Sequence, residues 1–159
     1  MQPSSDHLPP DEVLAVAAHC LCLKAQRAAR ALARRFDAAF RPLDLTNGQF
    51  SLLMALNRPR PPTISDLAQF LAMDRTTLTA ILKPLVRRGL VQVSQRAGDR
   101  RVRDVAITRD GVALLTLALP IWRATHGALD ASISLPRVDR LRGDLTHLTQ
   151  AVDTSASYP

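Results

Sequence analysis

This sequence of 159 residues has few cysteines, no long apolar run and no recognisable leader segment. With only Cys20 and Cys22, spaced C-x-C, the chain has no disulfide framework and lacks the four-ligand pattern of a structural zinc site. No stretch of about 18 uncharged apolar residues occurs, and residues 1–11 are polar, without a basic segment that leads into an apolar one. We therefore expect a cytoplasmic protein with no membrane partner.

The motifs of common enzyme classes are missing as well. The chain contains no G-x-S-x-G nucleophile elbow, no phosphate-binding P-loop and no H-E-x-x-H zinc motif. A soft-metal cluster at His19, Cys20 and Cys22 is disfavoured because no second pair of ligands follows it in the sequence. We predict that the protein is not an enzyme and holds neither a metal nor a cofactor.

Basic residues outnumber acidic ones, 21 to 14, which gives a formal net charge of +7. Such a charge predicts attraction to a polyanion such as nucleic acid. Arginine supplies 19 of the 21 basic residues, and its planar fork suits phosphate groups and guanine edges. A GC-rich genome would produce the same preference for arginine, so this bias does not by itself identify the partner.

The first expected element is one helix over residues 11–40, where neither glycine nor proline occurs and apolar residues recur in steps of three and four. Thirty helical residues span roughly 45 Å, more than a core of this size needs, so part of the helix is expected to pack on a second chain. Its other face is basic, and we interpret that face as solvated rather than as a binding stripe. It carries Lys24, Arg27, Arg30, Arg34 and Arg35.

Three helix starts are predicted in the middle of the chain, at Thr46, Thr63 and Asp74. The helix after Asp74 has the clearest apolar spacing in the sequence, with its inward side chains at Leu78, Ile81, Leu82, Leu85 and Val86. At 100° per residue, the opposite face then carries Thr76, Ala80, Lys83 and Arg87, flanked by Thr77 and Thr79. We expect a bend at Pro84 and a left-handed exit at Gly89.

A two-stranded hairpin with a basic tip is predicted next, because alternating apolar residues flank residues 96–101. Thr108 is expected to cap a helix that runs to about Leu129, and Pro136 to begin a final helix. Residues 1–10 and 154–159 are predicted to be disordered tails.

This order of elements is that of a winged helix-turn-helix, in which the helix after the turn enters the DNA major groove. The predicted fold class is mainly α (α+β), as a single domain over residues 11–153. Residues 46–107 form the winged helix-turn-helix, and residues 11–41 and 109–153 form long terminal dimerisation helices. Residues 63–104 contain eight basic and four acidic residues, a net charge of +4. More than half of the net charge is therefore expected in the DNA-binding region.

Over roughly residues 13–150 the sequence resembles the multiple antibiotic resistance regulator (MarR) family of bacterial transcription factors. The most specific part is Asp99-Arg100-Arg101 followed by Ile107-Thr108-Arg109-Asp110-Gly111, which resembles the family's D-R-R wing and L-T-x-x-G helix start, with Ile107 in place of leucine. Leu67-Ala68 and the stretches 74–79 and 85–91 also resemble the family's helix-turn-helix. The resemblance implies an obligate homodimer with intertwined terminal helices that binds double-stranded DNA at a near-palindromic operator.

The resemblance also implies roles for individual side chains. It places Arg75, Thr76, Thr77 and Thr79 at bases or phosphates, and Lys83 and Arg87 at phosphates. At the wing it implies that Arg101 enters the minor groove, that Asp99 orients Arg101, and that Arg100 and Arg103 contact phosphates. The alternative is an ordinary solvated charged turn.

The sequence is compatible with two kinds of signal, thiol oxidation and the binding of a small molecule. Organic-hydroperoxide regulators of the family carry a reactive cysteine in the first helix, where Cys20 and Cys22 lie, although structural roles are the alternative. On a continuous helix these two side chains point about 200° apart and should not bridge each other. Family ligand pockets suggest a small aromatic or phenolic effector, although for Trp122 and His126 core packing is the alternative. The candidate contacts for such an effector are His19, Arg27, Arg30, Trp122 and His126.

The sequence therefore predicts a homodimeric, sequence-specific DNA-binding transcriptional regulator, more often a repressor, released by a small molecule or by thiol oxidation. A winged-helix protein-interaction module without specific DNA binding is the alternative. The basic wing argues against that alternative, because a protein-docking domain has no physical reason to keep it.

Overall fold

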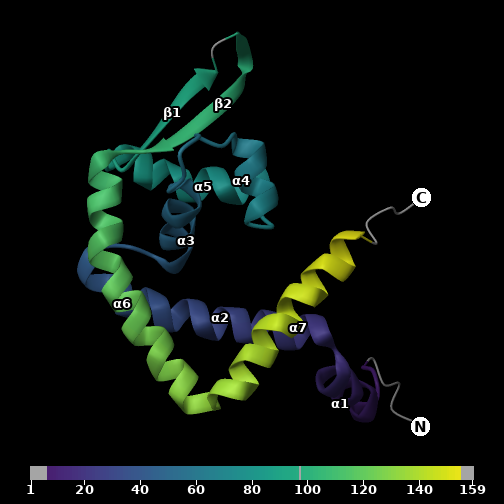
Figure 1. The fold of residues 1–159 in the computed structure, drawn as a ribbon. Coiled ribbons are helices and arrows are strands. Elements are labelled where there is room, and N and C mark those ends of the chain that lie inside the picture. The colour runs from purple at the N-terminus through teal and green to yellow at the C-terminus, as the bar shows by residue number, and fades with distance from the viewer. Residues whose placement is uncertain (1–6, 97, 155–159) are drawn as a thin grey trace.

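The computed structural model describes residues 7–96 and 98–154, and it is mainly helical with one small antiparallel sheet (Figure 1). Its elements are α1 (Pro10–His19), α2 (Leu21–Phe40), a 3-10 turn η1 (Arg41–Leu43), α3 (Asn47–Leu56), α4 (Ile64–Phe70), α5 (Arg75–Arg87), β1 (Val91–Arg96), β2 (Asp99–Ile107), α6 (Arg109–Ile133) and α7 (Leu135–Thr154). The predicted fold class is confirmed. Most of the two predicted tails, residues 1–6 and 155–159, lies outside the described residues.

The single helix predicted over residues 11–40 is wrong, because the chain breaks into α1 and α2 at Cys20. The Cys20 backbone is extended (φ −68°, ψ 109°), its N–H donates to the Val16 carbonyl, and its Sγ accepts from the Leu23 N–H at 3.4 Å. Cys20 therefore ends one helix and caps the next without the glycine or proline that would mark a break in the sequence. The 200° separation of the two thiols assumed a continuous helix and does not apply.

The three helix starts predicted in the middle of the chain are confirmed. Thr46 and Gln49 form a reciprocal capping box at α3, and Thr63 and Asp66 form another at α4. The Asp74 carboxylate accepts from the Thr77 N–H at 2.8 Å and starts α5. Because each cap satisfies backbone N–H groups that no helical carbonyl can reach, these short segments fix where the helices of the winged region begin.

The core lies where α2, α3, α5 and α6 meet the base of the sheet, and its largest fully buried side chains include Phe40, Leu53, Leu78, Leu85 and Val105. On α5 the predicted inward residues Leu78, Leu82 and Leu85 are buried. Val86 is 41% exposed, contrary to the prediction. At 100° per residue it lies at the edge of the buried arc, where the neighbouring helices do not cover it.

The predicted hairpin is confirmed as β1 and β2, whose base is tied to the helices at both ends. The Val105 N–H donates to the Pro62 carbonyl at 2.9 Å, next to the start of α4. The Thr108 hydroxyl donates to the Gly89 carbonyl at 2.7 Å and accepts from the Gly111 N–H at 3.1 Å. Gly89 takes the left-handed exit from α5 that the sequence predicts (φ +70°). The wing is thus anchored to α4, α5 and α6.

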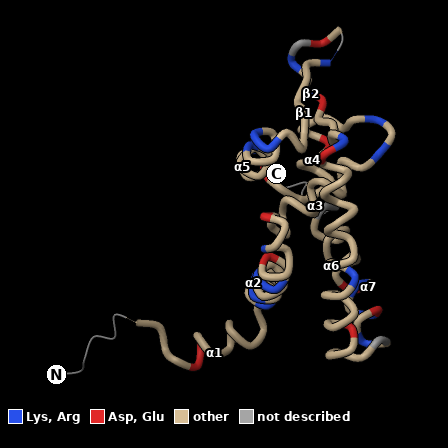
Figure 2. The backbone as a smooth tube through the Cα atoms, turned by 90° about the vertical axis from the view of Figure 1, so that its left-hand side faces the viewer, with Lys and Arg blue, Asp and Glu red and all other residues tan. Residues whose placement is uncertain are grey.

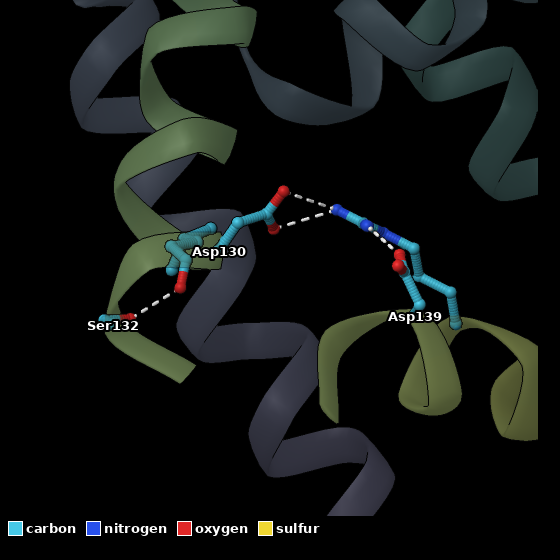
Figure 3. Close-up of polar contacts among 5 residues, drawn as sticks. Asp130, Ser132 and Asp139 are labelled. Carbon is cyan, nitrogen blue, oxygen red and sulfur yellow. Dashed lines mark hydrogen bonds and ion pairs between the residues drawn. The ribbon is translucent and has the colours of Figure 1, made fainter. Parts of the chain in front are cut away.

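The two terminal helices α6 and α7 form a V in which α7 turns back from the end of α6 (Figure 1). A charged cluster holds this corner: Figure 3 shows carboxylates of Asp130 on α6 and Asp139 on α7 facing one guanidinium, that of Arg142. The Arg142 Nη2 lies 2.8 Å from Asp130 Oδ1 and 2.9 Å from Asp130 Oδ2, and Nη1 lies 2.9 Å from Asp139 Oδ1.

The α6 helix itself is long and apolar enough to cross a membrane by length and composition, although Arg123 interrupts its apolar run.

Candidate nucleic-acid interface

The outward face of α5 is polar and exposed, as the sequence predicts. Its side chains Arg75, Thr76, Thr77, Thr79, Lys83 and Arg87 are all exposed. Two of the hydroxyl groups donate within the helix: Thr77 Oγ1 to Asp74 Oδ2 at 2.6 Å, and Thr79 Oγ1 to the Arg75 carbonyl at 2.7 Å. Because these hydrogens are engaged, the two oxygens face solvent as acceptors, suited to amino groups of bases.

The first turn of α5 is also electrostatically organised. Hydrogen bonds from the Thr77 hydroxyl and backbone hold the pKa of the Asp74 carboxyl below its usual range, so the cap stays ionised. Arg75 Nη2 donates to Ser65 Oγ on α4 at 2.7 Å. This contact holds the Arg75 guanidinium against the first turn of α4.

A polar cleft of about 530 Å³ lies between the start of α5 and the wing. Its lining residues are Thr63, Ile64, Ser65, Arg75, Thr79, Arg96, Arg101, Val102 and Arg103. Four of the predicted DNA contacts, Arg75, Thr79, Arg101 and Arg103, therefore come together in one place. Figure 2 shows basic residues along the wing and on the neighbouring α5. Guanidinium groups are chemically suited to phosphate, so this arginine-lined cleft is a candidate site for the backbone of a nucleic acid.

At the wing tip, Asp99 Oδ1 accepts from the Arg101 backbone N–H at 2.9 Å. The resemblance implies that Asp99 orients Arg101, and in the structure this carboxylate holds the Arg101 backbone. Arg101 is exposed, in agreement with a side chain that reaches a ligand outside the protein. The side chain of Arg100 lies outside the described part of the chain.

Lys83 and Arg87 do not line the cleft that the wing arginines share with Arg75. They line a second groove, of about 520 Å³, together with Leu82, Val86 and Val93. This groove shares Ile64 and Thr79 with the cleft, so Lys83 and Arg87 lie beside the cleft, about one and two turns beyond Thr79 on α5. A flanking phosphate is the contact compatible with this position.

The wing contains a pair of charged residues that the sequence did not single out, Arg96 and Asp104. Arg96 Nε lies 3.1 Å from Asp104 Oδ2, and Arg96 Nη2 lies 2.6 Å from Asp104 Oδ1. Side chains of opposite charge at diagonal positions of a hairpin can pair, so the opposite charges of Arg96 and Asp104 on the two sides of the predicted hairpin were a signal for this contact.

The cysteines and their neighbours do not converge on a metal site. Cys20 is partly exposed and Cys22 is exposed, and both are free thiols, so neither is fully buried within this chain. His19 Nδ1 lies 2.9 Å from the Ala15 carbonyl oxygen. Among residues 7–96 and 98–154, no group of three His, Cys, Asp or Glu side chains is arranged to hold a metal ion.

The candidate effector contacts are divided between two regions. Trp122 and His126 pack together on α6, with ring centroids 4.4 Å apart, and His126 also packs on Phe36 of α2 at 4.7 Å. Burial lowers the pKa of the His126 imidazole from its ordinary value of 6.5. Arg27 and Arg30 are exposed on α2, away from this cluster, and Arg30 donates to Gln26 Oε1 at 3.4 Å.

An open, largely apolar groove of about 630 Å³ lies between α3, α4 and α6, and Trp122 is the only predicted contact in its lining. Phe50, Met54, Phe70 and Leu119 supply most of its apolar wall. Arg58, which the sequence did not single out, lies at its rim with its guanidinium carbon 5.2 Å from the centroid of the Phe70 ring. An apolar wall with one cation at the rim suits an aromatic anion.

The comparisons with known proteins agree with this geometry. Residues 45–102 match the sequence profile of the MarR family. The transcriptional repressor NicR of Pseudomonas putida is 39% identical over 79 residues, which cover 50% of this chain and 50% of NicR. The transcriptional activatory protein BadR of Rhodopseudomonas palustris is 34% identical over 107 residues, 65% of this chain and 57% of BadR. The matches therefore span only about half the length of these two curated relatives.

A solved structure extends the similarity to nearly the whole fold. The transcriptional regulator MosR of M. tuberculosis, in complex with DNA, is 38% identical and superposes with a TM-score of 0.76. The aligned region covers 87% of this chain and 99% of that MosR chain. Because residues 46–107 make up less than half of the chain, the aligned region also includes much of the helical sequence outside the winged region.

Proposed function

Because this chain belongs to the MarR family of transcriptional regulators, we propose that it is a sequence-specific DNA-binding regulator that acts as a homodimeric repressor in the cytoplasm. The observation that carries the proposal is the cleft in which Arg75, Arg96, Arg101 and Arg103 surround the space between α5 and the wing. In this proposal α5 lies in the major groove and the wing reaches the adjacent minor groove. Repression is proposed by analogy with the transcriptional repressor NicR, whereas BadR is a transcriptional activatory protein.

The direct test is fluorescence anisotropy on DNA from upstream of the protein's own gene and on scrambled DNA of equal length, across a salt series. Preferred binding to the upstream DNA, with an affinity that falls steeply as salt rises, supports the proposal. Equal binding to both DNAs would contradict sequence specificity. A complete lack of binding at low salt would favour the protein-interaction module.

Exposed apolar side chains support the homodimer. Within one chain, Leu14 is 69%, Leu21 66%, Leu117 61% and Leu145 48% exposed, and they are distributed over α1, α2, α6 and α7. Single exposed apolar side chains are common on protein surfaces, but these four lie on the helices outside the winged region, which the second chain of a homodimer would cover. The same argument accounts for the apolar composition of α6 without a membrane. Light scattering of the purified protein tests this step, and a monomeric mass at micromolar concentration would contradict it.

We further propose that an effector with an aromatic ring and an acidic group releases the protein from DNA by binding the groove beside Trp122. The support is the ring contact of Phe50 with Trp122 at 6.4 Å and the placement of Arg58 at the rim. Because α3, α4 and α6 all line the groove, an occupant would alter how the wing region sits on the long helices. A screen of phenolic and aromatic acids in the anisotropy assay tests this, with Arg58→Ala as the variant expected to lose the response.

Thiol oxidation is the second proposed signal. Its support is that Cys22 is exposed and that Cys20 Sγ caps α2, so a change at either sulfur would act at the junction of α1 and α2. Peroxide is expected to release DNA from the wild type and to fail with at least one of Cys20→Ser and Cys22→Ser. If both single variants and the double variant respond as the wild type does, the thiols are not the sensor.

A further inference from the structure

The ion pair between Arg96 and Asp104 has a geometry unlike that of an ordinary surface pair. Two nitrogens of one guanidinium face the two oxygens of one carboxylate, at 3.1 Å and 2.6 Å. The Asp104 side chain is 21% exposed and that of Arg96 is 45% exposed. Such a forked pair fixes the orientation of both side chains more strongly than a single contact between point charges.

The pair lies where the wing loses its regular register. The ladder is regular from Val91↔Ile107 to Gln95↔Arg103, and the next pair is Arg96↔Asp99. Residues 100–102 therefore stand outside the ladder, between the two partners Asp99 and Arg103. Arg101 is the middle residue of this irregular segment, and Arg96, whose partner is Asp99, is the last β1 residue of the ladder.

Asp104 also lies where the wing meets the helix-turn-helix. Its backbone forms an isolated antiparallel bridge with Thr63, the cap of α4, and the following residue, Val105, donates to the Pro62 carbonyl. One residue thus connects three parts of the proposed interface: the chain that enters α4, the regular part of β2 and, through Arg96, the last residue of β1.

Electrostatics alone gives no reason for a carboxylate at this place. Asp104 adjoins a cleft lined by four arginines, where a negative charge repels the phosphates of DNA and neutralises one of the cations that attract them. The presence of Asp104 is explained if DNA recognition requires the forked contact between its carboxylate and Arg96.

From this placement we infer that Asp104 is a positioning residue for DNA recognition: through the forked contact with Arg96 it sets how the irregular segment presents Arg101. The inference rests on the proposed function and adds to it a residue whose own charge opposes DNA binding. Arg96, held by Asp104, serves as part of this support rather than as a free phosphate contact.

The test compares Asp104→Asn, Arg96→Lys, Arg101→Ala and the double variant Asp104→Asn/Arg101→Ala in the anisotropy assay with upstream and scrambled DNA. Asp44→Asn is the matched control, because Asp44 pairs with Arg88 outside the wing and its left-handed backbone (φ +49°) tolerates asparagine. Asp104→Asn and Asp44→Asn each remove one negative charge. Circular dichroism and light scattering establish that each variant keeps its fold and mass.

We expect Asp104→Asn to weaken binding to the upstream DNA by about fivefold or more, on the scale of a lost charged contact, although it removes a negative charge. Binding to scrambled DNA should be unchanged or tighter, as for Asp44→Asn. Arg96→Lys keeps the charge and loses the fork, so it should match Asp104→Asn. In the Arg101→Ala background, Asp104→Asn should cause little further loss, because its effect passes through Arg101.

Three results would overturn the inference. The first is an affinity of Asp104→Asn for upstream DNA equal to or above that of Asp44→Asn. The second is a loss of affinity from Asp104→Asn that adds fully to the loss from Arg101→Ala in the double variant. The third is an affinity of Arg96→Lys for upstream DNA equal to that of the wild type. If the wild type itself does not distinguish upstream from scrambled DNA, the proposed function fails and the inference fails with it. If the wild type prefers upstream DNA and one of the three results occurs, the inference alone fails.

Discussion

Arg101 lies at the point of the wing where charge, exposure and backbone irregularity coincide, and its removal has a definite expected cost. Arg101→Ala should weaken operator binding by at least about 1 kcal/mol, because it deletes a cationic contact with DNA. Dimer mass and helicity should stay as in the wild type. Anisotropy provides the measurement.

Arg34→Ala is the matched control for Arg101→Ala. Arg34 is exposed on the basic face of α2, which the sequence suggests is simply solvated. If the two variants lose the same affinity, net charge alone explains the loss, and the wing has no special role.

Gly111, in the first turn of α6, allows this helix to approach Leu90 and the end of β2 closely because glycine has no Cβ atom. A Cβ atom built at Gly111 would lie 2.3 Å from the Leu90 carbonyl oxygen and 2.7 Å from Ile107 Cγ1. Because the nearer atom belongs to the backbone, Gly111→Ala should lower the free energy of unfolding by about 1–3 kcal/mol, the usual cost of overpacking. Urea denaturation measures the change.

Gly127 lies on the same helix and offers the reverse case. A Cβ atom there meets nothing within 4 Å. Gly127→Ala should therefore leave stability unchanged or raise it by up to about 1 kcal/mol through helix propensity. A neutral Gly111→Ala would show that the close approach between α6 and Leu90 relaxes at little cost.

At the scale of elements, His126 contacts Phe36 of α2 and Trp122 of α6, and we expect its titration to make the packing of these helices sensitive to pH. Burial lowers its pKa below the ordinary 6.5, opposed by Asp130, and Arg142 lowers it further. Since the unfolded chain then binds more protons than the folded one in the window just below pH 6.5, stability should fall as the pH drops through that window. Thermal denaturation between about pH 7 and pH 5.5 measures this loss.

His126→Phe keeps ring contacts with Phe36 and Trp122 and removes the titration. The variant should lose less stability than the wild type over the same pH range. Equal pH dependence of the two proteins would assign the effect to other groups.

The elements also show how far local sequence signals extend. The caps at Thr46, Thr63 and Asp74 depend on hydrogen bonds within three residues, so their positions can be predicted from a short window. The break at Cys20 depends on a weak sulfur acceptor, which no propensity rule marks. The exposure of Val86 depends on which neighbouring helices cover α5, and this is not encoded in the spacing of its own residues.

For the whole molecule, the strongest expectation concerns association. Leu117→Glu places a charge on an apolar side chain of α6 that is 61% exposed within one chain. If a partner covers this surface, the buried charge is costly, so the variant should be largely monomeric and should bind operator far more weakly, because both half-sites need a wing. Light scattering and anisotropy on the same samples measure both effects.

Met54→Glu is the control for Leu117→Glu. Met54 is 41% exposed on α3, outside the long terminal helices, so the same change from apolar to acidic should leave the mass unchanged. Dimers that persist in Leu117→Glu would place the interface elsewhere.

The sequence by itself determined the class of fold, the winged arrangement and the basic character of the interface. These follow from periodicity, capping residues and charge, which act over a few neighbouring residues or add up regardless of position. Only the tertiary structure decided that Arg75, Thr79, Arg101 and Arg103 share one cleft and that Lys83 and Arg87 lie outside it. It also decided that Asp104 pairs with Arg96 and that Arg58 approaches Phe70. Such contacts join residues from different elements, and their geometry depends on how helices and strands pack rather than on distance along the chain.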